Sequence, residues 1–329
     1  FFLWSKMSVL VTGGLGFIGA NVALQLLKKD ISVIVADLDN NQNKQNKEKL
    51  LKKINKLKKN SNSITFEKLD ITNLENLEKI FSSYKIDSVI NLAYGIGAIC
   101  EEQPLLASKI NIVGTTSVFD MVVKYNIRRL VFASSETVYG EKQAVYGNRA
   151  IKEEDFTGIN NHFFTYGVMK LLNEFMAEKY IKKHGCSIAY TRPSVVFGFG
   201  RQNTALNWAE DFASKPALGL PVNLPFSKNN KDNWIYVEDC AEQLVRLCLK
   251  DNLNFSCFNT GSQTVDGYEL ENTVKKIIPE AKLNFLKESA FTPLIDDQDD
   301  KRIRKEIDFH PRSFAEGVEC LIREARESV

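Results

Sequence analysis

A glycine-rich turn between two apolar segments places the strongest constraint on the fold of this chain. The apolar run Val9–Val11 predicts a short buried strand. The turn Thr12–Gly19 follows, with glycine at positions 13, 16 and 19, and apolar residues at helical spacing come next. In a strand–turn–helix unit of this kind the glycines let the backbone approach a pyrophosphate, and the helix N-terminus offers N–H groups and the positive end of its dipole. Alone, the pattern is weak evidence, because many loops carry several glycines.

A second apolar run, Ser32–Ala36, ends in an acidic residue, Asp37, which lies 18 residues after Gly19. An acid at this place accepts hydrogen bonds from the ribose hydroxyls of an adenosine and repels a 2′-phosphate, which favours NAD over NADP. The alternative is that Asp37 is only a turn or cap residue. After this glycine turn we favour the ribose role.

Strands and helices alternate through the first half of the chain. We predict further strands over 63–72, 86–94 and 129–135, with helices over 73–84 and 104–125 between them. This alternation predicts an α/β fold of the Rossmann type, in which a doubly wound parallel sheet of about seven strands is covered on both faces. Ligands of such sheets bind at the carboxyl ends of the strands. The residues expected at these ends are the glycine turn, Asp37, Asp70, Asn91–Tyr94 and Ser134–Tyr139.

Tyr166 and Lys170 lie four residues apart at the start of a predicted helix over 166–184. Residues at this spacing share one helix face, and an ammonium beside a phenol lowers the pKa of the phenol. Such a tyrosine takes a proton from a substrate hydroxyl near neutral pH while a hydride leaves the same carbon. The pair by itself is common. Its position after the Ser134–Ser135 strand, in a chain with the glycine turn, makes it a catalytic candidate.

Composition and charge exclude several other classes of protein. The chain is 44% hydrophobic and 26% charged, with a net charge of +2, which argues against a dedicated nucleic-acid or membrane-surface protein. The lysine-rich segment 40–63 has apolar residues at helical spacing, which favours an amphipathic surface helix over a nucleic-acid patch. No apolar run approaches the roughly 18 residues of a membrane span. The six cysteines form no C-x-x-C and no metal-ligand spacing with histidine, so we expect reduced thiols, no metal site and a cytoplasmic location.

Taken together, these motifs resemble the extended short-chain dehydrogenase/reductase family, in its NAD-dependent epimerase/dehydratase branch. The matching positions are Thr12–Gly19, Asp37, Asp70–Ile71, Asn91–Ala93, Asn111, Ser134–Gly140, Tyr166-x-x-x-Lys170, Arg192–Gly198, Trp234–Asp239 and Arg302–Pro311. The combination is specific for the family and unspecific for a substrate.

The resemblance implies roles for individual residues. Tyr166 would be the acid/base, Lys170 would tune it and hold the nicotinamide ribose, and Ser135 would hydrogen-bond the reacting oxygen. The implied NAD contacts are Gly13, Gly16, Phe17 and Ile18 at the pyrophosphate, Asp37 at the ribose, Asp70 and Ile71 at the adenine, Leu92, Ala93 and Asn111 along the cofactor cleft, Ser134 beside them, and Pro193 near the nicotinamide. The family habit also implies a homodimer in which helices 104–125 and 166–184 pair with their counterparts.

The expected domain division follows the same resemblance. Residues 7–196 with 234–262 would form the NAD-binding domain. Residues 197–233 with 263–329 would form a smaller C-terminal lobe that binds a small-molecule substrate, and residues 1–6 would be an N-terminal extension. The candidate substrate contacts are Tyr94, Glu136 and Arg201, although Arg201, like Lys231 and Arg302, also fits an ordinary surface charge.

Two departures from the family narrow the chemistry. Sugar-nucleotide 4,6-dehydratases carry Asp-Glu where this chain has Glu136-Thr137, so the second carboxylate is missing and 4,6-dehydration is not expected. The Gly-Asp-Gly turn and Arg-Asp pair of many sugar-nucleotide epimerases are absent before Trp234, which weakens the case for a nucleotide-diphosphate substrate.

Three functions remain open at this point. We expect first an NAD-dependent epimerase of a sugar or sugar nucleotide, which acts by transient hydride transfer to bound NAD. The alternative is an NAD-dependent dehydrogenase of a small hydroxyl substrate, such as a sugar acid, hydroxy acid or amino-acid-derived alcohol, that releases NADH. The third is a non-catalytic NAD-binding regulator, against which the intact Ser135–Tyr166–Lys170 set argues.

Overall fold

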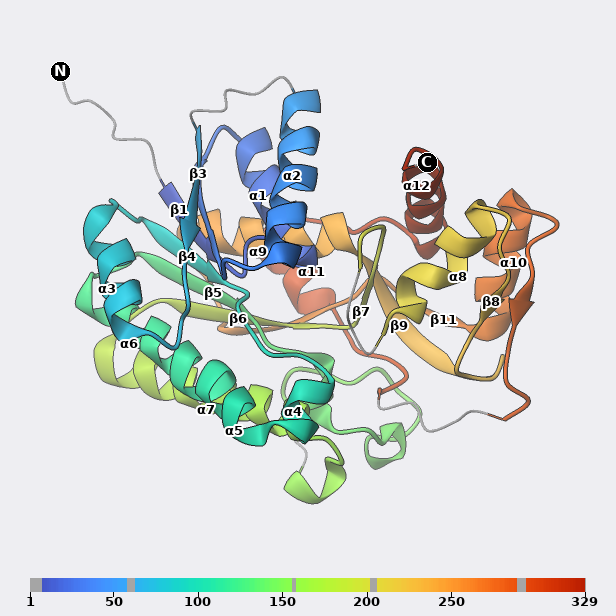
Figure 1. Cartoon of the computed structure of the whole chain (residues 1–329). Helices are drawn as coiled ribbons and strands as arrows, with labels where there is room; N and C mark the ends of the chain where they lie inside the picture. Colours follow the sequence, from blue (N-terminus) through green and yellow to red (C-terminus); the bar gives the residue numbers. More distant parts are fainter. Residues whose placement is uncertain (1–7, 58–62, 156–157, 202–205, 289–293, 329) are drawn as a thin grey trace. The chain divides into compact units, whose positions relative to one another are not determined.

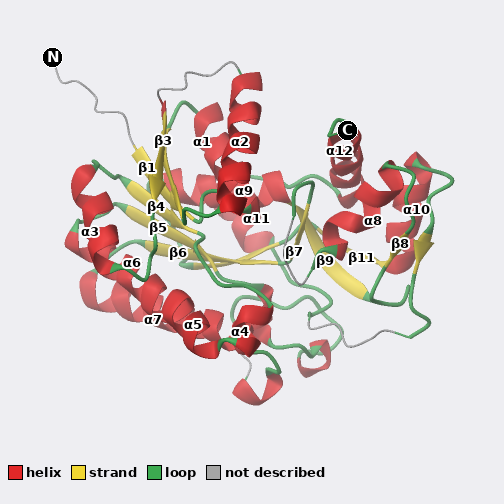
Figure 2. Cartoon of the chain, in the orientation of Figure 1, coloured by secondary structure: helices red, strands yellow, loops and turns green. Residues whose placement is uncertain are grey.

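The structure, a computed structural model, describes residues 8–57, 63–155, 158–201, 206–288 and 294–328. The extension expected at residues 1–6 lies outside the described residues. Figure 1 labels the elements along the chain, and Figure 2 gives the same view by secondary structure.

The main sheet has seven strands in the order β10-β6-β5-β4-β1-β2-β3. These strands are β1 (Ser8–Thr12), β2 (Ser32–Asp37), β3 (Ile64–Lys68), β4 (Ser88–Asn91), β5 (Arg129–Ala133), β6 (Ile188–Pro193) and β10 (Cys257–Thr260). Every pair from β3 to β6 is parallel. The strand order reverses at β1, which has β4 on one side and β2 on the other, and ligands of such sheets bind at this reversal. The α/β fold with a parallel sheet of about seven strands is therefore confirmed.

Helices cover both faces of this sheet. In Figure 1, α1 (Phe17–Lys28) and α2 (Asn41–Lys56) lie on one face, and α3 (Leu74–Ser83), α6 (Thr115–Lys124) and α7 (Thr165–His184) lie on the other. The core of the second face includes Phe81, Phe119 and Phe132. Because both faces are covered, the central strands are apolar without alternation, as Val9–Val11 shows.

The helix expected over 104–125 is built from three parts. It begins as α5 (Pro104–Ser108), continues as the π-helix η2 (Lys109–Gly114), and ends as α6. The stretch Pro104–Lys124 is long and apolar enough to cross a membrane by length and composition alone. Half of its most apolar window is buried inside the protein, and Val118, Phe119 and Val122 belong to the core under the sheet. This is the behaviour of a core helix.

The chain divides into two compact units. Unit 1 comprises residues 1–134, 169–191 and 241–257, and unit 2 comprises residues 135–168, 192–240 and 258–329. These boundaries differ from the expected ones, because segment 135–168 belongs with unit 2. The reason is a set of hydrogen bonds within that unit: Tyr139 Oη donates to Asn259 Oδ1 at 2.7 Å, and Ile151 exchanges backbone hydrogen bonds with Asp297 and Asp299.

Unit 2 contains two small sheets that the sequence analysis did not separate. One has the order β11-β9-β7 and the other pairs β12 with β8. Its strands are β7 (Val195–Phe197), β8 (Val222–Asn223), β9 (Lys231–Tyr236), β11 (Gln263–Asp266) and β12 (Leu283–Asn284), and its helices are α8 (Trp208–Ala217), α10 (Gly267–Ile277), α11 (Lys301–Ile307) and α12 (Phe314–Arg326). The short α4 (Ala98–Glu102) belongs to unit 1, and α9 (Val237–Leu249) begins in unit 2 and continues in unit 1. Phe197, Phe212, Trp234 and Phe314 form an aromatic core in unit 2.

Candidate active site

The glycine loop between β1 and α1 packs closely against the end of β4. Gly13 has a φ angle of +63°, a left-handed conformation that favours glycine. A Cβ atom on Gly13 would lie 2.6 Å from the backbone nitrogen of Ala93, so only glycine allows this approach. The N-cap of α1, Gly16, makes no side-chain cap hydrogen bond, and Phe17 and Ile18 form the first turn of the helix. The N-terminus of α1 is therefore suited to an anionic ligand.

The end of β4 is attached directly to the end of β1. Thr12 Oγ1 donates to Asn91 Oδ1 at 2.5 Å, and the Leu92 amide donates to the Thr12 carbonyl at 3.0 Å. Leu92 and Ala93 are half-buried beside the glycine loop. The structure thus brings these predicted cofactor contacts together with Gly13.

Asp37 lies at the end of β2 and holds the glycine loop in place. Its Oδ2 atom accepts the Leu15 amide at 2.9 Å, and its Oδ1 atom accepts the Leu38 amide at 2.8 Å and Asn43 Nδ2 at 2.9 Å. Burial raises the pKa of Asp37, and these three donors act against it. Because a carboxylate has about four acceptor positions, one on Oδ2 receives no donor among the described residues, and the ribose contact stays a prediction.

Asp70 and Ile71 follow β3. Asp70 Oδ1 accepts both the amide and the hydroxyl of Thr72, at 2.9 and 2.7 Å. Ile71 is buried and packs on Gly114, where a Cβ atom would lie 2.8 Å from Ile71 Cδ1. In the structure Asp70 therefore stabilises a turn and Ile71 packs in the interior. The contact of both residues with an adenine stays a prediction.

Asn111 lies within the π-helix η2 and clamps the loop that follows β4. It is fully buried; its Oδ1 atom accepts the Gly95 amide at 2.7 Å and its Nδ2 atom donates to the Gly95 carbonyl at 3.0 Å. Nδ2 also lies 3.5 Å from Met169 Sδ. Since single π turns often mark functional sites, we note that this one fixes the loop carrying Tyr94.

Lys170 is buried in α7, with 4% of its surface exposed. Its Nζ atom donates to the Ala133 carbonyl at 2.5 Å and lies 3.4 Å from the centroid of the Tyr94 ring. Burial lowers the pKa of Lys170 to about 7, and Glu174 and Cys100 act in the opposite direction. Tyr166 stands one turn earlier in the same helix, so the predicted pair is carried on one helix face.

Ser134, a predicted cofactor contact, uses its side chain within the protein. Its Oγ atom donates to Glu174 Oε1 at 2.5 Å, and both residues are buried. Glu174, which follows Lys170 by one helical turn, was not predicted from the sequence. Neither was Asn173, whose Nδ2 atom donates to the Tyr94 hydroxyl at 3.2 Å.

Ser135 lies in unit 2, where it begins the segment that α7 packs against. It has extended backbone, and its Oγ atom accepts from the amide and hydroxyl of Thr137 at 3.2 and 2.9 Å. A Cβ atom on Gly167 would lie 2.5 Å from the Thr137 carbonyl oxygen. The missing side chain at Gly167 therefore lets the first turn of α7, with Tyr166, sit directly on the Ser135 segment.

Glu136 is a buried carboxyl group, and its Oε2 atom has no hydrogen-bond partner within the described part of the chain. Burial raises its pKa well above the usual range, and the charge of Asp232 raises it further. Asp232 is equally buried, its Oδ1 atom has no partner among the described residues, and burial raises its pKa to about 7. Asp232 was not predicted from the sequence.

Arg201 is half-buried rather than a plain surface charge. It donates to the Val196 carbonyl, and burial lowers its pKa to about 10, while Tyr166 and Glu210 act in the opposite direction. Arg201 therefore lies within electrostatic reach of Tyr166 in unit 2.

The remaining predicted residues have varied surroundings. Pro193 ends β6 and is buried. Arg302 pairs with Glu153 and Glu154, and Lys231 is exposed.

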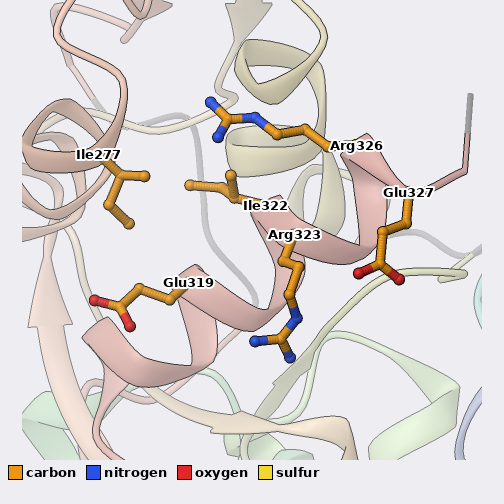
Figure 3. Close-up of a pocket in the computed structure, with 6 residues that line it drawn as sticks. All are labelled: Ile277, Glu319, Ile322, Arg323, Arg326 and Glu327. Atoms are coloured by element: carbon orange, nitrogen blue, oxygen red, sulfur yellow. The ribbon is translucent and has the colours of Figure 1, made fainter.

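One surface hollow is lined by none of these residues. Figure 3 shows its lining along α12, with Glu319, Ile322, Arg323 and Arg326, and Ile277 at the end of α10. Its volume is about 310 Å³. No predicted site residue lines it. Within the described part of the chain no three His, Cys, Asp or Glu side chains are grouped to hold a metal ion, and the six cysteines are free thiols.

Comparison with known proteins adds independent information. A sequence model of the NAD dependent epimerase/dehydratase family matches residues 9–261. UDP-glucose 4-epimerase 2 of Arabidopsis thaliana is 43% identical over 135 residues, which are 40% of this chain and 37% of that protein. The chain thus matches less than half the length of this plant relative.

Solved structures extend the likeness of fold over nearly the whole chain. The UDP-glucose 4-epimerase of Thermotoga maritima, solved with UDP-glucose, has a TM-score of 0.79 at 23% identity and covers 98% of this chain and 99% of its own. The L-threonine 3-dehydrogenase of Trypanosoma brucei has a TM-score of 0.78 at 20% identity and covers 96% of each chain. Two kinds of enzyme therefore share this fold.

Proposed function

Since the chain belongs to the NAD-dependent epimerase/dehydratase family, we propose that it is an NAD-dependent epimerase of a sugar or sugar nucleotide. The catalytic residues in this proposal are Tyr166, Lys170 and Ser135. The observation that carries it is the buried Lys170 ammonium, whose pKa of about 7 lies in the range where it can tune a tyrosine one helical turn away.

The residues around the glycine loop fit NAD. The backbone of Gly13 lies against β4 where a Cβ atom would clash, the N-terminus of α1 has no side-chain cap, and Asp37 keeps one acceptor position at the end of β2. A carboxylate there also disfavours the 2′-phosphate of NADP. When bound, NAD would supply the acceptor for a hydride from the substrate.

The residues of the chain supply the proton chemistry. Tyr166, as phenolate, takes the proton from the substrate hydroxyl, because the positive charge on Lys170 favours the phenolate. Ser135 Oγ already accepts from Thr137, so its own hydroxyl proton is directed elsewhere and would donate to the reacting oxygen. Returning the proton to the substrate after the configuration has changed restores Tyr166, so no net proton is consumed.

A dehydrogenase is the second candidate, and one observation favours it. The described part of unit 2 contains two buried carboxyl groups, Glu136 and Asp232. Glu136 follows Ser135 directly in the chain, and the charge of Asp232 acts on Glu136. A substrate that carries an amino or hydroxyl group would bond to these acids, as an amino-acid-derived alcohol would. The L-threonine 3-dehydrogenase of Trypanosoma brucei shares the fold.

The test separates the two candidates. The purified protein is denatured and the released NAD is assayed; the native protein is then offered sugar nucleotides and small hydroxy compounds while NADH absorbance is followed. Retained NAD with product formation and no NADH supports the epimerase. Stoichiometric release of NADH would contradict it and support the dehydrogenase. Tyr166→Phe should abolish either activity and keep NAD bound; full activity in this variant would refute the mechanism.

We also propose that the protein forms a homodimer through α5, η2 and α7. Their exposed side chains include Leu105, Val113, Leu172 and Phe175, which are 72%, 54%, 42% and 56% exposed. Exposed apolar residues grouped on neighbouring helices favour burial against a second copy. Sedimentation tests this: a monomer at micromolar concentration would refute it, and Phe175→Glu should convert a dimer to monomers.

A further inference from the structure

Glu174 is a buried carboxylate for which the proposed reaction has no use. It stands one turn after Lys170 in α7, and 3% of its surface is exposed. Ser134 donates to its Oε1 atom at 2.5 Å, while the neighbouring Ala133 carbonyl accepts from Lys170 Nζ at 2.5 Å. Glu174 and Lys170 are therefore attached to two consecutive residues at the end of β5.

Tyr94, Cys100 and Glu174 of unit 1 all act on the Lys170 ammonium. The ring of Tyr94, which follows β4, lies under the ammonium. The thiol of Cys100, in α4, acts on Lys170 too, but burial raises the pKa of this thiol and favours its neutral form. On its own helix Lys170 has Tyr166 one turn before it and Glu174 one turn after it. Of the groups in unit 1, Glu174 has the largest effect that opposes burial.

A buried ammonium without a counter-charge loses its proton, because burial disfavours the charged form. A neutral Lys170 could not favour the phenolate of Tyr166. We propose that Glu174 is a positioning residue for Lys170: held by Ser134, it keeps the lysine side chain charged and fixed at the end of β5. Its effect on catalysis rests on the proposed function, whereas the charge on Lys170 can be measured without substrate.

The direct test is an NMR titration of the full-length protein, as purified with its NAD, with lysine labelled at Cε. Lys170→Arg identifies the Lys170 resonance. In Glu174→Gln the titration midpoint of Lys170 should fall by about one pH unit, the shift expected when a nearby opposite charge is removed. The matched control is Glu178→Gln, one turn further along α7. The glutamine keeps an oxygen that can accept from Tyr190 and Ser256, as Glu178 does. The Lys170 midpoint in this variant should equal that of the wild type.

An unchanged midpoint in Glu174→Gln would overturn the proposal. If this variant does not fold, Ser134→Ala takes its place, because it removes the donor that fixes the carboxylate and leaves the carboxylate present. The Lys170 midpoint should then fall by a smaller amount, and an unchanged value would again overturn the proposal. Glu174→Asp should restore part of the shift, which a merely structural role would not predict.

The pH dependence of kcat/KM separates this inference from the proposed function. With less charge on Lys170 the phenolate of Tyr166 forms at higher pH, so the acid limb of the profile should move upward in Glu174→Gln. A shifted midpoint with an unmoved profile would support the role of Glu174 and refute the Tyr166–Lys170 step. A shift in both supports both.

Discussion

The Lys170 ammonium lies over the ring of Tyr94, with 3.4 Å between Nζ and the ring centroid. An aromatic face stabilises a desolvated cation, and the ring is itself fixed by the hydrogen bond from Asn173 to the Tyr94 hydroxyl. Tyr94, which the sequence analysis proposed as a substrate contact, therefore also supports the lysine.

Removing the ring should weaken catalysis more than removing the hydroxyl. Tyr94→Leu should lower kcat/KM by about 5- to 30-fold, since a buried cation–π contact contributes roughly 1–2 kcal/mol. Tyr94→Phe keeps the ring and loses only the acceptor of Asn173, so its loss should be smaller. Steady-state kinetics of both variants provide the measurement. Equal losses would show that the hydroxyl, and not the ring, matters.

Asp37 should determine both cofactor affinity and cofactor choice. Asp37→Asn removes a charged acceptor at the end of β2, and a hydrogen bond to a charged group contributes about 1.5–3 kcal/mol, so the Kd for NAD should rise about tenfold or more. The affinity for NADP should increase, because the repulsion of a 2′-phosphate is gone. Calorimetric titration measures both. Asp39→Asn, which alters a half-exposed acid two residues away, should change neither.

Much of the main sheet could be predicted because its strands are buried on both faces. Such strands are unbroken apolar runs between turn residues, and the run 32–37 coincides with β2. The strands β8, β11 and β12 have two to four residues and mixed exposure, so no pattern marks them. The π-helix at Lys109–Gly114 was not foreseen, because the apolar residues of 104–125 predicted only a regular helix.

The site divides in the same way. Spacing within one helix identified Tyr166 and Lys170. Glu174, four residues after Lys170, was not identified, because the sequence does not show that its carboxylate is buried and bonded to Ser134. Asp232 could not be found, because its burial and its effect on Glu136 arise from the packing of segments far apart in the sequence. The units also differ from the expected domains, since hydrogen bonds such as that between Tyr139 and Asn259 leave no trace in composition.

Gly167 should not tolerate a side chain, although alanine normally stabilises a helix. In Gly167→Ala the new Cβ atom would lie 2.5 Å from the Thr137 carbonyl oxygen and 3.1 Å from His162 Cδ2. This overlap should destabilise the protein by roughly 1–3 kcal/mol, more than the gain of about 1 kcal/mol in helix propensity. Urea unfolding checks the prediction. Gly158→Ala, where a Cβ atom meets nothing within 4 Å, should be nearly neutral; equal effects at both positions would contradict the packing argument.

The buried acids of unit 2 should make the protein less stable as the pH rises. Asp232 has a pKa of about 7 in the folded state against 3.8 as its ordinary value, chiefly because of burial. The folded state therefore holds a proton that the unfolded state has already released, and between these two values stability falls with increasing pH. The same sign applies to Glu136, whose pKa is also raised by burial and by Asp232.

Asp232→Asn removes this proton linkage and keeps an oxygen that can accept from Asn230, as Asp232 does at 2.8 Å. At about pH 4 the free energy of unfolding of the variant should equal that of the wild type. At about pH 8 the variant should be more stable by up to about 4 kcal/mol. Glu136→Gln should show a gain of the same sign, and Glu280→Gln, which alters an exposed acid in unit 2, should show none. Urea unfolding at a series of pH values provides the free energies. A difference between Asp232→Asn and the wild type that does not grow with pH would mean that the carboxyl group is ionised in the folded protein, and that a cation or a donor outside the described contacts compensates its charge.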